Sequence, residues 1–157
     1  MRDGDGWTRC SAGHRHWGRF GAAGLLVAAP DVDGAIRVLL QHRATWSHHG
    51  DTWGVPGGAR GRAETAEQAA LREAGEETGL DPVAVTTLAA YVDDHGGWAY
   101  TTVLATAAGL LDVHAEDRES TAVAWVAVAQ VAALALHPGF ATSWPALQEQ
   151  VAAFDLS

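Results

Sequence analysis

Residues 58–80 of this chain of 157 residues read GARGRAETAEQAALREAGEETGL. Eight positions of this stretch form a spaced pattern of two glycines, an arginine, four glutamates and a closing leucine: Gly58, Glu64, Arg72, Glu73, Glu76, Glu77, Gly79 and Leu80. Each of these residue types fills roughly one position in fifteen, so the first seven positions match by chance on the order of once in 10^8 starting points. The spacing is therefore a signal of function.

Signals for a helix lie within this stretch and just after it. Thr65 and Gln68 match the capping box, in which a hydroxyl and an amide side chain reciprocally bind exposed backbone amides at a helix start. Gly79 suits the left-handed residue that ends a helix, and Pro82 follows three residues later. The sequence predicts a helix over 65–78 whose glutamates point outward. Its packed face is expected to contain small or apolar residues: Leu71, Ala74, Gly75 and Thr78.

Three carboxylates gather on one face of the predicted helix. At about 100° per residue, Glu76 and Glu77 lie within about 60° on either side of Glu73. Neighbouring carboxylates repel one another, so this face needs a cation, and oxygen ligands favour Mg2+ or Mn2+ over zinc. A solvated acidic helix face is the ordinary alternative for three glutamates alone. The other positions of the motif argue against it.

The spacing resembles the Nudix box, and every specified position is met, with Ala74 in the apolar slot. The segment Trp53-Gly54-Val55-Pro56-Gly57 before Gly58 also looks like the lead-in of that family. The resemblance implies an α/β fold, a Nudix-type α/β/α sandwich with a mixed sheet. It also implies hydrolysis of a diphosphate bond with the help of a divalent metal.

The resemblance assigns roles within the box. It implies that Glu64 pairs with Arg72, which can hold a carboxylate in a fixed orientation by a bidentate contact. It implies that the metal ligands are three glutamates and a backbone carbonyl: Glu73, Glu76, Glu77 and Gly58. The catalytic set is then expected to include the box residues Glu64, Arg72, Glu73, Glu76 and Glu77.

Composition and charge restrict the class of protein. One domain is the expectation at this length, which buries roughly two-thirds of the surface of the unfolded chain. The net charge of -9 argues against long nucleic acid and anionic membranes as partners, because Lys and Arg neutralise phosphates in such complexes. No apolar run reaches the roughly 18 residues of a membrane span, and residues 1–6 lack an apolar segment. We therefore expect a cytoplasmic protein.

The rest of the chain alternates strands and a few helices. Residues 1–19 are expected to form an N-terminal hairpin extension, and residues 20–157 a single domain. Cys10 is the single cysteine, and a zinc site with His14 and His16 is the alternative to an inert thiol in the hairpin. The other expected elements are strands 21–29, 35–43, 83–92, 100–107 and 123–126, a loop over 44–58, and helices 128–136 and 143–154, the last with Pro145 in its first turn.

Substrate-binding candidates gather around the loop over 44–58. Arg43 precedes it, and in similar enzymes a basic residue near this position reaches a substrate phosphate; a surface ion pair is the alternative. Trp46 and Trp53 present aromatic faces on which a nucleobase could stack, although tryptophans also pack in cores. His48 and His49 are candidates for contacts with phosphate or for the general base.

A general base outside the box has several candidates. Glu119 lies six residues before Trp125 in an acidic loop, where similar chains often place a catalytic or metal-binding acid. A second frequent acidic position, three residues before that tryptophan, is Ala122 here. The rivals are a box glutamate and three residues of a turn: Asp93, Asp94 and His95.

Together these features predict a hydrolase that cleaves the diphosphate bond of a nucleoside diphosphate linked to another group. Compact size favours a small nucleotide substrate, either a nucleoside triphosphate or an oxidised nucleotide. ADP-ribose, nucleotide sugars, dinucleotides and capped RNA ends remain open, and so does a nucleotide-sensing module without catalysis. The protein is expected to act as a monomer or a homodimer.

Overall fold

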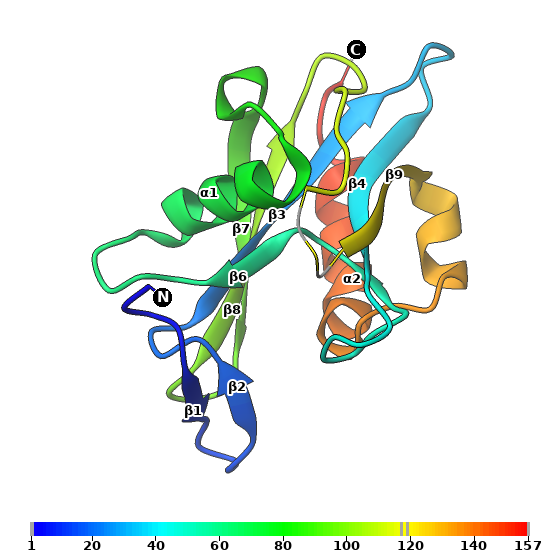
Figure 1. The fold of residues 1–157 in the computed structure, drawn as a ribbon. Helices are drawn as coiled ribbons and strands as arrows, with labels where there is room; N and C mark the ends of the chain where they lie inside the picture. Colours follow the sequence, from blue (N-terminus) through cyan, green and yellow to red (C-terminus); the bar gives the residue numbers. More distant parts are fainter. Residues whose placement is uncertain (1, 117, 119, 157) are drawn as a thin grey trace.

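A mixed β-sheet with a helix on each face forms the body of the molecule (Figure 1). The computed structural model describes residues 2–116, 118 and 120–156. The strands are β1 Trp7–Arg9, β2 Arg15–Trp17, β3 Ala22–Pro30, β4 Ile36–Arg43, β5 Trp53–Gly54, β6 Gly57–Ala59, β7 Thr86–Asp94, β8 Ala99–Thr106 and β9 Ser120–Ala127. The helices are α1 Ala66–Thr78 and α2 Pro138–Ala152, with 3-10 helices η1 Pro82–Ala84 and η2 Val128–Ala133. The predicted α/β/α sandwich with a mixed sheet is confirmed.

Strand β3 lies at the centre of the sheet. It pairs in parallel with β8, starting at Ala22 and Tyr100. Its other edge is shared, because β4 pairs antiparallel with its C-terminal end and β6 with its N-terminal end. Strands β5 and β9 pair with β4, and β7 pairs with β8 at the opposite edge. This register sets Gly58 of β6 beside Ala23 of β3, so the 58–80 motif begins at the middle of the sheet.

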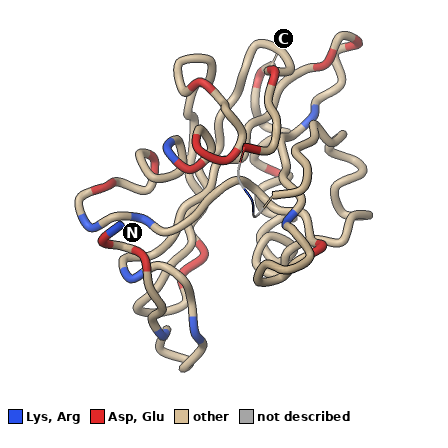
Figure 2. The backbone as a smooth tube through the Cα atoms, viewed as in Figure 1, with Lys and Arg blue, Asp and Glu red and all other residues tan. Residues whose placement is uncertain are grey.

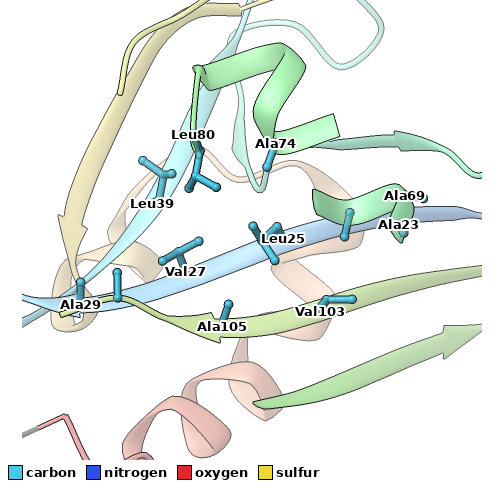
Figure 3. Packing of buried hydrophobic residues seen from close by; sticks show 12 residues of the cluster. Ala23, Leu25, Val27, Ala29, Leu39, Ala69, Ala74, Leu80, Val103 and Ala105 are labelled. Carbon is cyan, nitrogen blue, oxygen red and sulfur yellow. The ribbon is translucent and has the colours of Figure 1, made fainter. Parts of the chain in front are cut away.

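The sequence of β3 explains why the core has two layers. Its residues are buried without alternation because both faces of the strand are covered. Odd-numbered residues 23–29 pack in the layer of α1, whereas Leu26 and Ala28 pack in the layer of α2. Figure 3 shows the first layer, in which Ala69 and Ala74 of α1 lie over β3 and β8. Such small side chains allow the helix to approach the sheet closely.

Both ends of α1 carry the signals expected from the sequence. The Thr65 hydroxyl accepts a hydrogen bond from the Gln68 amide at 3.1 Å, and the Gln68 side-chain oxygen accepts one from the Thr65 amide at 2.9 Å. Gly79 follows the last turn with a φ of 73°, a left-handed conformation that strains residues with a Cβ. The predicted helix over 65–78 is therefore confirmed.

The packed face of α1 is wider than predicted. Ala74 and Thr78 are buried as expected, but Ala69 and Ala70 are buried too. Leu71 and Gly75 are only half-buried. The difference arises because α1 lies along the sheet from its first turns, where its contacts with β3 and β8 already begin.

The segment between β4 and α1 contains two strands where the sequence predicts a loop over 44–58. Trp53–Gly54 forms β5 and Gly57–Ala59 forms β6, and Val55 and Pro56 between them are buried. Glycine-rich strands offer few side chains, so an apolar pattern does not reveal them. The strand predicted from Val83 also starts later, at the first residue of β7, because η1 precedes it.

Helix α2 begins earlier than predicted. Pro138 occupies its first turn, where a missing amide costs nothing, and the Nδ1 atom of His137 accepts a hydrogen bond from the Gly139 amide at 3.1 Å. Pro145, expected in the first turn, therefore lies inside the helix. The helix predicted over 128–136 is the 3-10 helix η2, which stops at Ala133.

The N-terminal hairpin forms a separate two-stranded sheet that docks on the turn between β7 and β8 (Figure 1). The Ser11 amide donates to the Gly96 carbonyl at 2.7 Å, and the His16 ring stacks on Trp98 with 4.0 Å between ring centroids. The division into an extension over 1–19 and a domain over 20–157 stays a prediction. Within the described part of the chain, no helix is long and apolar enough to span a membrane.

Replacing Thr65 by alanine tests the start of α1. The variant loses the hydroxyl acceptor of the capping box and should lower the free energy of unfolding by about 1 kcal/mol. The matched control, Thr65→Ser, keeps that acceptor and should remain within about 0.5 kcal/mol of the wild type. Urea denaturation followed by circular dichroism measures both variants. Equal stabilities of the alanine and serine variants would contradict the role of this cap.

Candidate active site

A close approach between β6 and α1 brings the motif together. Gly58 on β6 faces Glu73 on α1, and a Cβ at position 58 would lie 2.7 Å from the Glu73 Oε1 atom. Any side chain at position 58 would displace the Glu73 carboxylate from this position. The backbone of β6 and a carboxylate of α1 consequently line the same site.

One guanidinium connects most of the polar groups of the motif. Arg72 binds both carboxylate oxygens of Glu64, with Nε to Oε2 at 2.7 Å and Nη2 to Oε1 at 2.8 Å. It also donates to Glu73 Oε1 at 2.9 Å, to Glu76 Oε2 at 3.4 Å and to the Ala59 carbonyl at 3.1 Å. The contact expected between Glu64 and Arg72 is present. It ties the segment after β6 to the helix.

Glu64 and Glu73 have pKa shifts in opposite directions. Hydrogen bonds from Arg72 lower the pKa of Glu64 from 4.5 to about 2, and hydrogen bonding to Glu64 raises the pKa of Arg72. Burial raises the pKa of Glu73, although Arg72 opposes this shift. Glu64 is therefore a fixed anionic partner of Arg72 at neutral pH. An added cation would favour the charged form of Glu73.

The box glutamates differ in exposure, which corrects the prediction that all of them point outward. Glu77 is 8% exposed, and its Oε2 atom accepts a hydrogen bond from the Gly57 amide at 3.0 Å. The Glu73 side chain is 15% exposed and the Glu76 side chain 46% exposed. Strand β6 lies against Glu73 and Glu77 and leaves Glu76 open, so burial here depends on a second element and not on the helix alone.

The oxygen donors of the motif suit a hard divalent cation. Glu73, Glu76 and Glu77 supply carboxylate oxygens, the ligands that Mg2+ and Mn2+ prefer. Among the described residues, however, no three His, Cys, Asp or Glu side chains are grouped closely enough to hold an ion. This holds for the zinc alternative of Cys10, His14 and His16 as well. Arg72 lies between these carboxylates. A cation would compete with it for Glu76.

Arg2 is a second basic partner of the box that sequence reasoning missed. Its guanidinium pairs with Glu76, and the Asp3 carboxylate accepts a hydrogen bond from the Arg62 amide at 3.3 Å. The N-terminal segment therefore lies against the loop before α1, as Figure 1 shows. Nothing in the order of the chain signals a contact between residues 74 positions apart.

A family model described as NUDIX domain matches residues 19–149, which contain the whole constellation from Gly58 to Leu80. The chain belongs to the Nudix family. It is therefore an enzyme of the hydrolase class, a pyrophosphohydrolase, and Nudix hydrolases generally use a divalent metal.

Three relatives of this Nudix hydrolase are similar over most of its length. The Mycobacterium tuberculosis protein named "Putative 8-oxo-dGTP diphosphatase 3" is 52% identical over 162 residues, covering 99% of this chain and 74% of the relative. The Bifidobacterium longum "Nucleoside triphosphate pyrophosphatase/Nudix hydrolase fusion protein" is 42% identical over 146 residues, covering 90% of this chain and 30% of the relative. The crystal structure of the Nudix hydrolase RenU from M. smegmatis is 51% identical, with a TM-score of 0.90, and the match covers 98% of this chain and 99% of that one.

A second acidic segment runs beside the end of the Nudix helix. Figure 2 shows Asp and Glu on α1 and on the chain that leads toward β9. The Glu116 amide donates to the Glu77 carbonyl at 2.9 Å, and the His114 amide donates to the Thr78 carbonyl at 3.1 Å. Glu119, the predicted catalytic acid of this segment, lies outside the described residues. Its role stays a prediction.

The rival candidates for the general base have structural partners in the β7–β8 turn. The Asp93 carboxylate lies 3.0 Å from His95 Nε2, and Asp94 accepts a hydrogen bond from the Gly96 amide at 2.8 Å. The His95 ring also contacts the His16 ring, with 4.7 Å between centroids. These contacts stabilise the turn and the hairpin docked on it. A role as general base stays a prediction for each of the three residues.

Three of the predicted substrate-binding residues lie together. The Arg43 Nε atom donates to the His48 carbonyl at 2.9 Å, and the rings of His48 and His49 are 4.0 Å apart. His137, from the start of α2, joins them with its ring 4.7 Å from His49. Sequence reasoning missed His137. Its only local signal is its position directly before Pro138, where a helix can begin.

The two tryptophans predicted to stack a nucleobase have different surroundings. Trp46 is 65% exposed. Trp53 is half-buried in the layer of α2, with its ring 5.0 Å from His42. An unexpected third aromatic, Trp7 of the hairpin, is 48% exposed and lies 6.1 Å from the His48 ring. Stacking of a base on Trp46 or Trp53 stays a prediction.

The stability of the fold should depend on the protonation of His137. Burial, together with His49 and Arg43, lowers the pKa of His137 from 6.5 to about 4. The unfolded chain takes up this proton near pH 6.5 and the folded protein only near pH 4, so stability falls as the pH falls through this window. We expect this residue to remove about 2 kcal/mol of the free energy of unfolding across it.

His137→Asn tests this pH dependence. Asparagine retains an N-cap acceptor for the Gly139 amide but cannot titrate, so stability should change less between about pH 7 and about pH 4.5. Guanidinium denaturation at both pH values measures the slope. The exposed His14→Asn serves as control and should change the slope little. A slope for His137→Asn equal to that of the wild type would contradict the assignment.

Proposed function

We propose that this enzyme is an Mg2+-dependent or Mn2+-dependent pyrophosphohydrolase of small nucleotides, with a nucleoside triphosphate or an oxidised nucleotide as substrate. The observation that carries the proposal is the carboxylate face of α1, where Glu73 and Glu77 lie against the glycine backbone of β6 and Glu76 lies beside them in the open. A metal bound there would bridge phosphate oxygens and lower the pKa of an attacking water.

The other box residues would position the ligands. Arg72, anchored on both oxygens of Glu64, holds the carboxylates of Glu73 and Glu76 in fixed orientations. Gly58 would add its backbone carbonyl to the metal ligands. The general base would be Glu119 or a box glutamate. The other candidates are three residues at the end of β7 and in the turn after it: Asp93, Asp94 and His95.

The substrate would extend from the box toward the segment between β4 and β5. Arg43, His48 and His49 would contact phosphate, and Trp46 or Trp53 would stack the nucleobase. The name of the M. tuberculosis relative supports an oxidised nucleoside triphosphate as the substrate class. The net charge of -9 supports a small substrate over long nucleic acid or a membrane.

We place the catalytic activity in residues 20–157, with residues 1–19 as a hairpin extension. The enzyme would act as a monomer or homodimer in the cytoplasm. Its lone cysteine suits a reducing compartment, where disulfides are rare.

A substrate panel separates this function from its alternatives, which are hydrolysis of ADP-ribose or a nucleotide sugar, and nucleotide sensing without hydrolysis. The panel contains nucleoside triphosphates, 8-oxo-dGTP, ADP-ribose and a nucleotide sugar, ranked by kcat/KM because that ratio measures discrimination. We expect a triphosphate to rank first. A kcat/KM for ADP-ribose at least about tenfold above that of every triphosphate would overturn the substrate class. Binding without turnover would assign a sensor.

Glu76→Gln tests the metal face directly. The variant loses a charged oxygen of the most open box carboxylate, and we expect kcat with Mg2+ to fall by at least about 100-fold, since even indirect partners of metal ligands can cost this much. Release of pyrophosphate or phosphate measures the rate. Glu67→Gln, on the same helix but at an unspecified position of the box, is the matched control and should retain activity. An unchanged rate in a folded Glu76→Gln variant would contradict the proposed site.

A further inference from the structure

Four side chains that can carry positive charge meet beside the Nudix box, and they are called here the Arg43 cluster: Arg43, His48, His49 and His137. They come from the end of β4, the segment before β5 and the residue before α2. The ring centroids of His48 and His49 are 4.0 Å apart, and those of His49 and His137 are 4.7 Å apart. The cluster therefore joins segments that are far apart in sequence.

The backbone holds His137 in place from both sides. The Trp53 amide donates to the Ala135 carbonyl and the His137 amide donates to the Trp53 carbonyl, both at 2.8 Å. The Nδ1 atom of His137 accepts a hydrogen bond from the Gly139 amide at 3.1 Å. Since Nδ1 is an acceptor, the proton of the neutral ring is on Nε2. His137 thus presents an N–H donor of fixed direction at neutral pH.

The segment that carries His49 is also held in a defined conformation. The Arg43 amide donates to the Thr52 carbonyl at 2.9 Å, and the Asp51 amide donates to the Arg43 carbonyl at 3.0 Å. His49 has a φ of 54° and Asp51 a φ of 59°, a left-handed region that residues other than glycine enter at a cost in free energy. Such strain persists only where surrounding contacts impose it, and it is concentrated at functional sites.

The charges around the cluster are of one sign. Among the described residues, the charges of His48 and Arg43 act on His49, and those of His49, Arg43 and His48 act on His137. None of them is a carboxylate, and Asp51 instead lies 4.0 Å from His42. Burial and these neighbours lower the pKa of both histidines. The described groups of the cluster therefore offer a guanidinium and imidazole rings to an anion.

The cluster borders the box at Tyr100. Burial and the charge of Glu77 raise the pKa of Tyr100, and the charge of Arg43 lowers it, so both charged groups lie near this phenol. The Tyr100 hydroxyl also lies against the backbone of Gly57, where a Cβ would be 2.5 Å from it. Arg43 of the cluster and Glu77 of the box therefore lie near the same side chain.

We propose that Arg43, His49 and His137 form a phosphate subsite in which two imidazole side chains and one guanidinium bind a phosphate group of the substrate that extends beyond the metal face. The proposal rests on the proposed function for the identity of the substrate, but not for the binding of phosphate itself. His137 is then a substrate-binding residue that the chain supplies from the start of α2.

Binding of inorganic tripolyphosphate and inorganic phosphate, without divalent metal, tests the subsite apart from catalysis. Imidazole signals in 15N–1H NMR spectra report the contact, and we expect those of His49 and His137 to shift saturably. Saturation by tripolyphosphate at concentrations at least about tenfold below those of inorganic phosphate supports a substrate tail as the ligand, and equal affinities support a site for free phosphate. Histidine signals that stay unchanged at saturating tripolyphosphate would overturn the proposal.

Two asparagine variants remove imidazoles while preserving the backbone. Asparagine caps helices, which suits His137→Asn, and it tolerates a positive φ, which suits His49→Asn. Each should weaken tripolyphosphate binding by about tenfold or more, the value of a hydrogen bond to a charged group, and raise KM for the best substrate with little change in kcat. The control His14→Asn should bind as the wild type does. Unaltered binding in both folded variants would refute the subsite, whereas tripolyphosphate binding without nucleotide turnover would keep it and refute only the proposed function.

Discussion

The guanidinium of Arg72 lies between two parts of the chain that must meet for the site to exist, the segment after β6 and the acidic face of α1. It binds Glu64 through two hydrogen bonds and also reaches Glu73, Glu76 and the Ala59 carbonyl. Planar, delocalised charge makes arginine suited to several carboxylates at once. The orientation of Glu64, Glu73 and Glu76 depends on this one side chain.

The sheet provides the frame in which this contact is possible. Strand β4 pairs only with the C-terminal end of β3, and β6 pairs with the same edge of β3 at its N-terminal end. Because β3 is covered on both faces, small residues such as Ala69 and Ala74 bring α1 close to the strands. The glycines of β6 then meet the carboxylates of the helix without interference from side chains.

Charge is distributed around the site in two complementary parts. The box carboxylates need a cation, whereas the Arg43 cluster near Tyr100 has donors suited to an anion. In the proposed function, a metal-bound polyphosphate would satisfy both parts at once, since it carries positive charge at one end and free phosphate oxygens at the other. A chain with a net charge of -9 would then bind an anionic substrate through the local arrangement of a few groups.

Local signals in the sequence predicted the capped helix and the Nudix spacing, and the resemblance to the Nudix family implied the contact between Glu64 and Arg72 and the class of reaction. Sequence reasoning failed where a second element decides the outcome. The burial of Glu77 depends on β6, the strands β5 and β6 carry too few side chains to show a pattern, and His137 meets His49 only because α2 starts beside β5. Periodicity reports which residues share a face of one element. Only the tertiary structure decides what covers that face, because burial and electrostatic fields come from residues distant in the chain.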